Sequence, residues 1–268
     1  MKARLLAIDL DGTLLTHDKR ILASSLEAIQ QARDAGVTVV LASGRIRPSM
    51  RPFAEKLGLL DGPIICGNGT HVAASPSEDL YHLTIRPDAV EAIAKYAWDG
   101  GYHLNLYTQD RLFFLRDTPW GDLYRSRVET VVPETLNGNL TNLECLKVLL
   151  VDDPSHIANH SKSILELLGP KAVRATESEP EYLEFMDPRA TKGFALESLA
   201  KSLGILQEET AAIGDYLNDL EMVQFANLSG AVGNAHPILK ETAKVVVSSN
   251  EDGGVSEFIR LYVLQHQY

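Results

Sequence analysis

Runs of apolar residues alternate with segments of helical periodicity over most of the chain. Residues 3–8 predict a buried strand, and residues 24–35, which open with the capping-box pattern S-x-x-E, predict a helix. Strands are predicted again at 37–42 and 63–66, on either side of a helix at 47–58. Strands that alternate with helices in this way indicate a parallel sheet with helices on its faces.

The pattern changes near residue 83 and changes back near residue 189. A predicted hairpin is followed by a segment that mixes strands and helices, in which residues 117–143 have no assignment. Its predicted strands are 102–107, 112–115, 145–151, 172–175 and 182–186, and its predicted helices are 88–98 and 155–168. The alternation then resumes with strands at 210–213, 228–232 and 244–248 and helices at 192–203, 217–226, 237–242 and 254–265. We therefore predict an α/β fold: a Rossmann-like parallel-sheet core from residues 1–83 and 189–268, with an α+β domain inserted at 84–188.

The charge balance narrows the classes of function. The 268 residues include 36 acidic and 25 basic ones, a formal charge of −11, which disfavours a general binder of nucleic acids or membrane surfaces. An anionic substrate stays possible, because a divalent cation and one lysine can reverse the local sign of charge. No run approaches the roughly 20 apolar residues of a membrane span, and early aspartates interrupt any signal peptide. The two cysteines form no disulfide framework and have no metal-type spacing, and two free thiols are typical of a reducing compartment, so we expect a cytoplasmic protein.

Two carboxylates, Asp9 and Asp11, stand where the first predicted strand ends. A charged side chain there is costly to desolvate unless a cation or hydrogen bonds compensate for it. Ligands of open α/β sheets also bind at the carboxyl ends of the strands. Two carboxylates one residue apart can lie on either side of a bound group, one attacking while the other moves a proton. Taken alone, the spacing is explained more simply by ordinary loop or capping aspartates.

A second acidic pair, Asp215 and Asp219, follows the predicted strand at 210–213. The two residues are one helical turn apart, so their carboxylates can point the same way. Together with Asp9 they would supply the oxygen ligands that suit Mg²⁺. A helix cap would explain Asp215 alone, but two capping aspartates are more than one helix needs.

Other polar residues belong to the same predicted edge of the sheet. Ser43 and Gly44 follow the strand at 37–42 and could offer backbone N–H groups to an anion, although Ser-Gly is also common turn chemistry. Lys192 begins a predicted helix, where a cation opposes the helix dipole. That position suggests an anionic partner, and a solvated lysine is the ordinary alternative. Asn68 could belong only to a turn.

Together these motifs resemble those of the haloacid dehalogenase superfamily of phosphotransferases, and within it the Cof-type phosphatases (class IIB, with a C2 cap). The resemblance covers nearly the whole predicted core. Its four motifs follow in order: D-L-D-G-T-L-L from Asp9, A-S-G-R from Ala42, T-K-G from Thr191 and G-D-Y-L-N-D-L-E-M from Gly214. Serine replaces the usual threonine in the second motif and threonine the common serine in the third, so each hydroxyl is kept.

Further segments extend the resemblance beyond the four motifs. G-N-A from Gly233 and N-E-D-G-G-V from Asn250 are similar to segments that Cof-type proteins carry after the fourth motif. Asn68-Gly69 fits another segment, with Thr70 in place of a usual alanine. The predicted insert lies between the second and third motifs, where this branch carries its cap. The resemblance implies that the insert closes over the site, excludes water and selects the substrate.

The resemblance also implies a role for each site residue. Asp9 would be the nucleophile that forms an aspartyl-phosphate, and Asp11 would protonate the leaving alcohol and then deprotonate water. Mg²⁺ would be held by Asp9, the Asp11 backbone carbonyl and Asp215, with Asp219 as a further ligand or a supporting group. Phosphate or substrate would be bound by Lys192 together with Ser43, Gly44, Arg45, Asn68 and Asn218. Asn218 would orient Lys192 or the nucleophile.

We therefore expect a Mg²⁺-dependent phosphatase acting on a small phosphorylated metabolite, with a sugar phosphate as the specific expectation. Two alternatives stay open: a phosphomutase of the same superfamily, and a non-catalytic protein that binds a phosphometabolite. The catalytic acids speak against the last, because a sensor does not need Asp11. Candidate substrate contacts are Arg47 and five polar residues of the insert, each of which surface or core packing explains equally well: His103, Asn105, Tyr107, Glu184 and Arg189.

Overall fold

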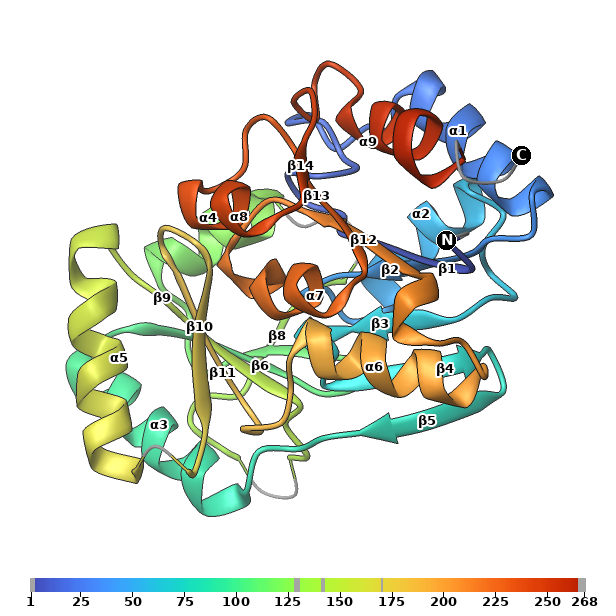
Figure 1. Ribbon diagram of the computed structural model, residues 1–268. Helices are drawn as coiled ribbons and strands as arrows, with labels where there is room; N and C mark the ends of the chain where they lie inside the picture. The colour runs from blue at the N-terminus through green and yellow to red at the C-terminus, as the bar shows by residue number, and fades with distance from the viewer. Residues whose placement is uncertain (1–2, 128–130, 141–142, 170, 265–268) are drawn as a thin grey trace. The chain divides into compact units, whose positions relative to one another are not determined.

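The computed structural model describes residues 3–127, 131–140, 143–169 and 171–264, and these form two compact units (Figure 1). The core unit comprises Met1–Gly44, Met50–Tyr81 and Thr191–Tyr268, and the insert unit comprises Arg45–Ser49 and His82–Ala190. The segment expected as an insert, 84–188, lies within the insert unit. Arg45–Ser49, which the sequence prediction assigned to the core, groups with the insert unit instead.

The described part of the core unit is built on one sheet with the strand order β14-β13-β12-β1-β2-β3-β4-β5. Pairing is parallel from β14 to β3, and β4 is antiparallel to β3. The strands are β1 (Leu5–Ile8), β2 (Thr38–Ala42), β3 (Ile64–Cys66), β4 (His71–Ser75), β5 (Glu78–His82), β12 (Thr210–Gly214), β13 (Leu228–Ala231) and β14 (Val245–Val246). The predicted parallel-sheet α/β core is confirmed.

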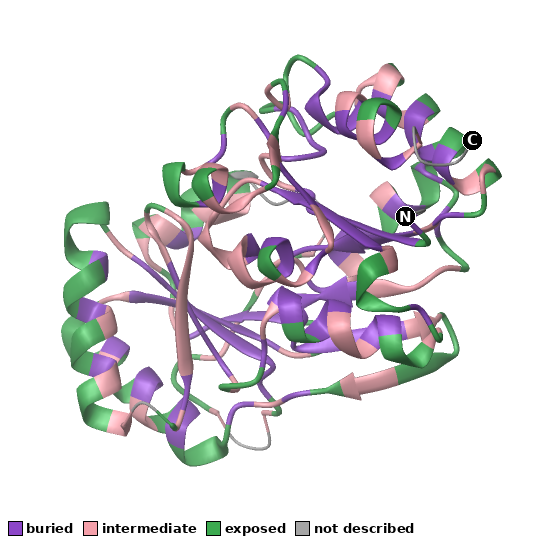
Figure 2. Cartoon of the chain, in the orientation of Figure 1, coloured by how far each residue is buried: buried purple, intermediate pink, exposed green. Residues whose placement is uncertain are grey.

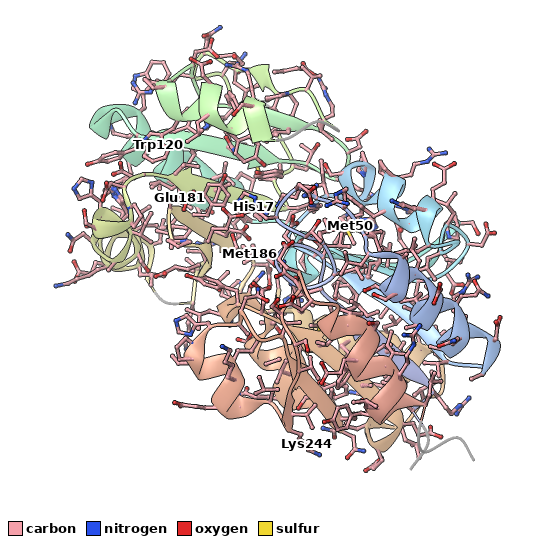
Figure 3. The ribbon with its side chains drawn as sticks, turned by 90° about the horizontal axis from the view of Figure 1, so that it is seen from above. His17, Met50, Trp120, Glu181, Met186 and Lys244 are labelled. Carbon is pink, nitrogen blue, oxygen red and sulfur yellow. The ribbon has the colours of Figure 1, made fainter. Side chains whose placement is uncertain are left out.

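Helices cover both faces of this sheet. Its helical elements are α1 (Ala23–Asp34), α2 (Arg47–Lys56), α6 (Lys192–Ser202), α7 (Leu220–Phe225), α8 (Pro237–Thr242), α9 (Gly254–Phe258), the 3₁₀ turns η1 (Gly67–Gly69), η2 (Gln207–Glu209) and η3 (Leu217–Asp219), and the π-helical turn η4 (Ile259–Val263). Met50 of α2, labelled in Figure 3, packs in the cluster around β1 and is completely buried.

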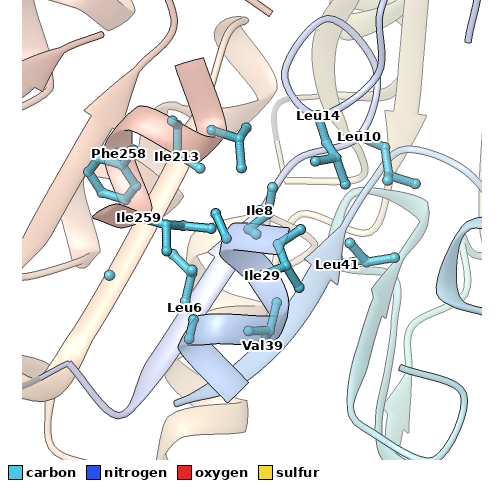
Figure 4. Packing of buried hydrophobic residues seen from close by; sticks show 14 of the residues in the cluster. Leu6, Ile8, Leu10, Leu14, Ile29, Val39, Leu41, Ile213, Phe258 and Ile259 are labelled. Atoms are coloured by element: carbon cyan, nitrogen blue, oxygen red, sulfur yellow. The ribbon is translucent and has the colours of Figure 1, made fainter. Parts of the chain in front are cut away.

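The central strand β1 explains why the chain begins with an unbroken apolar run. Leu6 and Ile8 pack in one cluster with α1 and α9, as the side chains of Ile29 and Phe258 show in Figure 4. The alternate residues of β1, Leu5 and Ala7, belong to a second cluster with α6 on the other face. Side chains alternate across a strand, so a strand covered on both faces must be apolar at every position.

Several predicted boundaries are wrong in ways that the structure explains. Helix α1 begins at Ala23 after Leu22, without a side-chain cap, so the predicted capping box does not form. Its glutamate, Glu27, accepts a hydrogen bond from Arg260 Nη2 at 3.2 Å instead. The helix predicted at 217–226 is a 3₁₀ turn followed by α7, and the one at 254–265 becomes π-helical at Ile259. Its last predicted residue, 265, lies outside the described residues.

The described part of the insert unit forms a second sheet with the order β10-β11-β9-β6-β7-β8, antiparallel except between β7 and β8. Its elements are α3 (Pro87–Gly100), β6 (His103–Tyr107), β7 (Leu112–Phe114), α4 (Pro119–Arg127), β8 (Glu134–Thr135), β9 (Lys147–Val151), α5 (Pro154–Leu168), β10 (Arg174–Glu179) and β11 (Tyr182–Met186). Helix α4 and strand β8 fall in the stretch without a predicted assignment, of which 128–130 and 141–142 lie outside the described residues.

The insert unit has its own hydrophobic interior. Leu104 and Leu106 of β6 pack with Ile93 of α3 and Ile157 of α5 on one face of the sheet. On the other face, Tyr107 clusters with residues of β7 and α4. The strands of both sheets are largely buried, whereas α5 turns an exposed side outward (Figure 2). No helix in the described ranges is long and apolar enough to cross a membrane.

Candidate active site

Asp9 lies directly after β1, at the carboxyl end of the central strand. Its backbone N–H donates to the Ile213 carbonyl at 3.1 Å, which fixes it beside β12. The side chain is almost completely buried, and its Oδ1 accepts a hydrogen bond from Lys192 Nζ at 2.6 Å. Its Oδ2 is also buried and accepts no hydrogen bond from the described residues. One carboxylate oxygen is therefore neutralised by a lysine, while the other has no hydrogen-bond partner in the described part of the chain.

Lys192 is fully buried in the first turn of α6. Its Nζ donates to Asp9 Oδ1 and also to Asp219 Oδ1 at 2.5 Å. Thr191 caps the helix by accepting a hydrogen bond from the Phe194 N–H at 2.9 Å. A cation in the first turn of a helix opposes the helix dipole, so the two carboxylates must compensate for its position. The solvated lysine considered as the ordinary alternative is excluded.

Asp215 and Asp219 follow β12, and the loop itself uses part of their hydrogen-bonding capacity. Asp219 Oδ2 accepts the backbone N–H groups of Asp215 at 2.9 Å and Tyr216 at 3.3 Å, while its other oxygen faces Lys192. Asp215 Oδ1 accepts the Thr13 hydroxyl at 3.0 Å. One oxygen from each of Asp9, Asp215 and Asp219 can be chosen so that all three lie within 4.8 Å of one another. These three residues are called the acidic cluster below. Asp9 comes from the end of β1, and Asp215 and Asp219 come from the loop after β12.

Gly12 lets the acidic cluster form. Its φ is +81°, and a Cβ at this position would lie 2.3 Å from Asp215 Oδ2. Only glycine adopts such a backbone readily and leaves room for the carboxylate. The Gly12 carbonyl in turn accepts a hydrogen bond from Asn234 Nδ2 at 2.8 Å, and the Leu15 carbonyl accepts one from Asn250 Nδ2 at 2.8 Å. The segments that begin at Gly233 and Asn250, which the sequence comparison with the family singled out, thus hold the loop after β1.

The electrostatics of the acidic cluster favour a further cation. Burial raises the pKa of Asp9 to about 7, with repulsion from Asp219 adding to the effect and Lys192 opposing it. Burial and the charge of Asp9 raise the pKa of Asp215 well above its ordinary value. The charges of Asp219 and Asp9 raise the pKa of Lys192 despite its burial. One lysine does not balance three carboxylates, and hard oxygen ligands with an unpartnered buried oxygen at Asp9 fit Mg²⁺.

Asp11 lies two residues beyond Asp9 and is more exposed. Its Oδ1 accepts a hydrogen bond from Lys19 Nζ at 2.8 Å. The sequence prediction missed Lys19, whose position depends on the loop after β1 turning back through a left-handed backbone, with φ of 57° at Lys19 itself. A positive φ at a lysine leaves no signal in the pattern of apolar and polar residues.

Three predicted phosphate-binding residues are linked at the next strand ends. The backbone N–H of Asn68 donates to the Ser43 carbonyl at 3.0 Å, and Asn218 Nδ2 donates to Asn68 Oδ1 at 3.0 Å. Asn68 is buried and has a left-handed backbone, with φ of 56°. Asn218 was expected to orient Lys192 or Asp9, but its hydrogen bond goes to Asn68. Ser43 and Gly44 lie at the end of β2, as predicted from the sequence.

Arg45 and the substrate candidates belong to the insert unit. Arg45 lies near enough to Tyr124 for its charge to act on the pKa of that phenol, which burial raises strongly. His103, Asn105, Tyr107 and Glu184 are all buried, and they project from β6 and β11 on the sheet face opposite α3 and α5. The carboxylate of Glu184 accepts a hydrogen bond from the buried Lys147 Nζ at 3.0 Å. Arg189 forms a paired contact with the carboxylate of Asp187, at 2.9 and 3.1 Å.

The fold and the acidic cluster together define an α/β enzyme with a carboxylate-rich site at the ends of its parallel strands. A family model described as haloacid dehalogenase-like hydrolase matches residues 6–259, and the chain belongs to this family. The match confirms the resemblance predicted from the motifs.

Similar proteins cover nearly the whole chain. The 5-amino-6-(5-phospho-D-ribitylamino)uracil phosphatase YcsE of Bacillus subtilis is 31% identical, over 97% of this chain and 96% of its own. An HMP-PP phosphatase of Yersinia pseudotuberculosis is 30% identical, over 96% of this chain and 94% of its own. A solved haloacid dehalogenase-like hydrolase from Bacteroides thetaiotaomicron is 27% identical, with a TM-score of 0.87 over 97% of this chain and 99% of that one. The chain is therefore an enzyme, a phosphoric monoester hydrolase of this family.

Proposed function

We propose that this hydrolase is a Mg²⁺-dependent phosphatase that acts on a small phosphorylated metabolite through an aspartyl-phosphate on Asp9. The observation that carries the proposal is the environment of Asp9. This carboxylate is buried beside Asp215, with one oxygen on Lys192 and the other without a hydrogen bond from any described residue. The proposal assigns Mg²⁺ to Asp9, Asp215 and the Asp11 backbone, with Asp219 as a supporting group. The ion would supply positive charge that offsets the carboxylates and the phosphoryl group.

In the first step, a carboxylate oxygen of Asp9 attacks phosphorus and the ester P–O bond breaks. Asp11 gives its proton to the leaving alcohol oxygen, and the product is an acyl phosphate on Asp9. In the second step, water attacks the phosphorus, Asp11 takes the proton from that water, and the P–O bond to Asp9 breaks, so that inorganic phosphate leaves and the Asp9 carboxylate is restored. Phosphoryl transfer requires mainly positioning and charge stabilisation, so Lys192 and the hydroxyl of Ser43 are assigned to the transferred oxygens.

The substrate class is proposed more broadly than a sugar phosphate. One relative is named for a ribityl-linked uracil phosphate and another for HMP-PP, so neither name describes a plain sugar phosphate. We propose that the insert unit selects among such esters. Arg45, Arg47 and the five polar residues named from the sequence stay predictions as substrate contacts.

A panel of phosphorylated metabolites tests this function, with release of inorganic phosphate as the readout. Sugar phosphates, phosphorylated ring compounds and nucleotides should be included, each with Mg²⁺ and with EDTA. We expect release from at least one member with Mg²⁺ and loss of that release with EDTA, restored by added Mg²⁺. Turnover that persists in EDTA would contradict the metal assignment, and the absence of phosphate release from every member would contradict the proposed substrate class. Conversion of a hexose phosphate to its isomer without phosphate release would identify a mutase.

A further inference from the structure

A second group of metal-type side chains lies wholly within the insert unit. Asp152 follows β9, and His156 and His160 lie one turn apart on α5. Asp152 Oδ2 is 3.1 Å from His156 Nδ1 and 2.8 Å from His160 Nε2. One ligand atom from each of the three residues can be chosen so that all lie within 4.8 Å of one another. We propose that these residues bind a divalent transition-metal ion, namely Zn²⁺.

The donor set selects the kind of ion. Two imidazoles and one carboxylate suit Zn²⁺ and its neighbours, whereas Mg²⁺ prefers oxygen ligands alone. A tetrahedral ion at the usual bond lengths holds its ligand atoms about 3.3 Å apart, close to the two measured separations. Three protein ligands leave the fourth position to water. The site therefore differs in chemistry from the acidic cluster, which offers only oxygen.

The helix does not need Asp152 for its own capping. Asp153 is the residue that caps α5, because its Oδ1 accepts the Ser155 N–H at 2.9 Å. Asp152 instead points its Oδ2 at both imidazoles. The carboxylate therefore serves the two imidazoles and not the helix end, which leaves it placed as a ligand shared with both histidines.

The surroundings of His160 orient it as metal-binding histidines are usually oriented. The ring is buried, and its Nδ1 lies 2.9 Å from the Tyr96 hydroxyl, a residue of α3. The Tyr102 ring packs against it with a centroid distance of 4.4 Å. With Nε2 bound to an ion, the ring proton resides on Nδ1 and is donated to the Tyr96 oxygen. Such an outer hydrogen bond fixes both the tautomer and the orientation of a ligating imidazole.

His156 gives an ion access to the site. Its side chain is 58% exposed, compared with 5% for His160. An exposed side chain can change rotamer at little cost, so His156 can close on an ion held by the two more buried ligands. The site thus combines a fixed half, Asp152 and His160, with one adjustable ligand.

Calorimetric titration of the full chain with Zn²⁺, in excess Mg²⁺, tests the proposal. We expect His156→Ala to bind one fewer Zn²⁺ per chain than the unaltered protein, or to bind it at least about tenfold more weakly. His82→Ala, which removes an exposed histidine outside the cluster, is the matched control and should leave the titration unchanged. The number of Zn²⁺ ions bound per chain is compared between variants that share the same acidic cluster. Any Zn²⁺ bound there therefore contributes equally to both and does not affect the difference. Equal stoichiometry and affinity in His156→Ala would overturn the proposal, as would the absence of Zn²⁺ binding.

A pair of tyrosine variants tests the role of the outer hydrogen bond. Tyr96→Phe removes the hydroxyl that faces His160 Nδ1 and should weaken Zn²⁺ binding about tenfold. Tyr102→Phe removes a hydroxyl from the neighbouring ring, leaves that hydrogen bond in place and should preserve the affinity. Equal effects of the two variants would contradict the assignment of Tyr96 as the positioning residue. Phosphatase activity does not enter either readout, so the test stands apart from the proposed function.

Discussion

Asp9 has two oxygens in different surroundings, and this asymmetry supports its proposed role as the nucleophile. Lys192 orients one oxygen, and the other is buried without a hydrogen bond from the described residues. A buried carboxylate left partly unpartnered is costly and persists only where function needs it. Asparagine has nearly the same shape but cannot form the acyl phosphate, so it separates chemistry from packing.

Asp9→Asn is expected to lower phosphate release by about four orders of magnitude or more, since the nucleophile is lost. The fold should be retained, because burial raises the pKa of the Asp9 carboxyl and so already disfavours its charged form, which asparagine lacks. Phosphate release and the far-UV circular dichroism melting curve of the purified variant check both parts. Asp11→Asn, which keeps the nucleophile, should lose less activity than Asp9→Asn. Near-normal turnover by Asp9→Asn would exclude it as the nucleophile.

At the scale of elements, the approach of α6 to α7 places Lys192 in the acidic cluster. A Cβ on Gly193 would lie 2.6 Å from the backbone carbonyl of Glu221. The glycine after the lysine therefore allows the two helices to pack, and the lysine is carried to Asp9 by that packing. This explains the Lys-Gly pair without reference to any ligand.

Gly193→Ala is expected to destabilise the core unit by about 1–3 kcal/mol and to reduce kcat, because α6 must shift away from α7 and move Lys192 with it. Gly62→Ala is the matched control, since a Cβ there meets only the Leu59 carbonyl at an ordinary 3.5 Å. Thermal melting and phosphate release should change for Gly193→Ala and stay nearly constant for Gly62→Ala. Equal behaviour of the two alanine variants would contradict this role.

The face of β6 opposite α3 and α5 carries a pH-sensitive group. Burial lowers the pKa of His103 to about 4, against an opposing hydrogen bond with Asn105. An unfolded histidine titrates near 6.5, so between these values the unfolded chain binds more protons than the folded one. The stability linked to His103 is complete above about pH 6.5 and is lost as the pH falls towards 4.

His103→Gln, which does not titrate, isolates this contribution. Relative to the variant, the unaltered protein should lose about 2 kcal/mol of unfolding free energy between pH 7.5 and pH 5. Both tryptophans, Trp98 and Trp120, lie in the insert unit, so their fluorescence during urea unfolding reports this unit. The other titrating groups are common to both proteins and cancel in the difference. A pH-independent difference would show that His103 does not titrate in this range.

The elements that the sequence predicts well are those with a strong apolar pattern. The parallel strands and the family motifs are of this kind, because burial on both faces of β1 demands a continuous apolar run. Helix α4 and strand β8 were missed because their sequences are short and largely polar. The link between Asp11 and Lys19 and the contact of Asn218 with Asn68 were missed for another reason. They depend on how loops turn in space, which apolar periodicity does not record.

At the scale of the whole molecule, each of the two units packs its own hydrophobic interior within the described ranges, and the insert unit takes residues from two separate parts of the sequence. Ile46 follows the second family motif directly, yet it is buried among Tyr107, Phe114 and Leu149 of the insert unit. A segment next to Ser43 and Gly44 thus completes the interior of the insert unit. The boundary between the units does not coincide with the ends of the inserted sequence.

Ile46→Ala is expected to destabilise the insert unit by about 2–4 kcal/mol, the cost of a cavity in a packed interior. Tryptophan fluorescence during urea unfolding should show the loss. Leu167→Ala truncates an apolar side chain of the insert unit that is 59% exposed, and it should change the stability by less than about 0.5 kcal/mol. A similar, small effect of both truncations would contradict the packing of Ile46 with the insert unit.

The pairing of β1 with β12 has a consequence for the order in which the protein can be made. Thr13 and its partner Asp215 are 202 residues apart, and the whole insert lies between them. A ribosome adding about 5–20 residues per second needs roughly 10–40 s to cover that distance. During this time the nascent chain carries β1, the future centre of the sheet, with one of its neighbours not yet synthesised. The main part of the insert unit, His82–Ala190, is complete by then and can begin to fold first. Asp9, the proposed nucleophile, is therefore the earliest residue of the acidic cluster to be translated and among the last to reach its final environment.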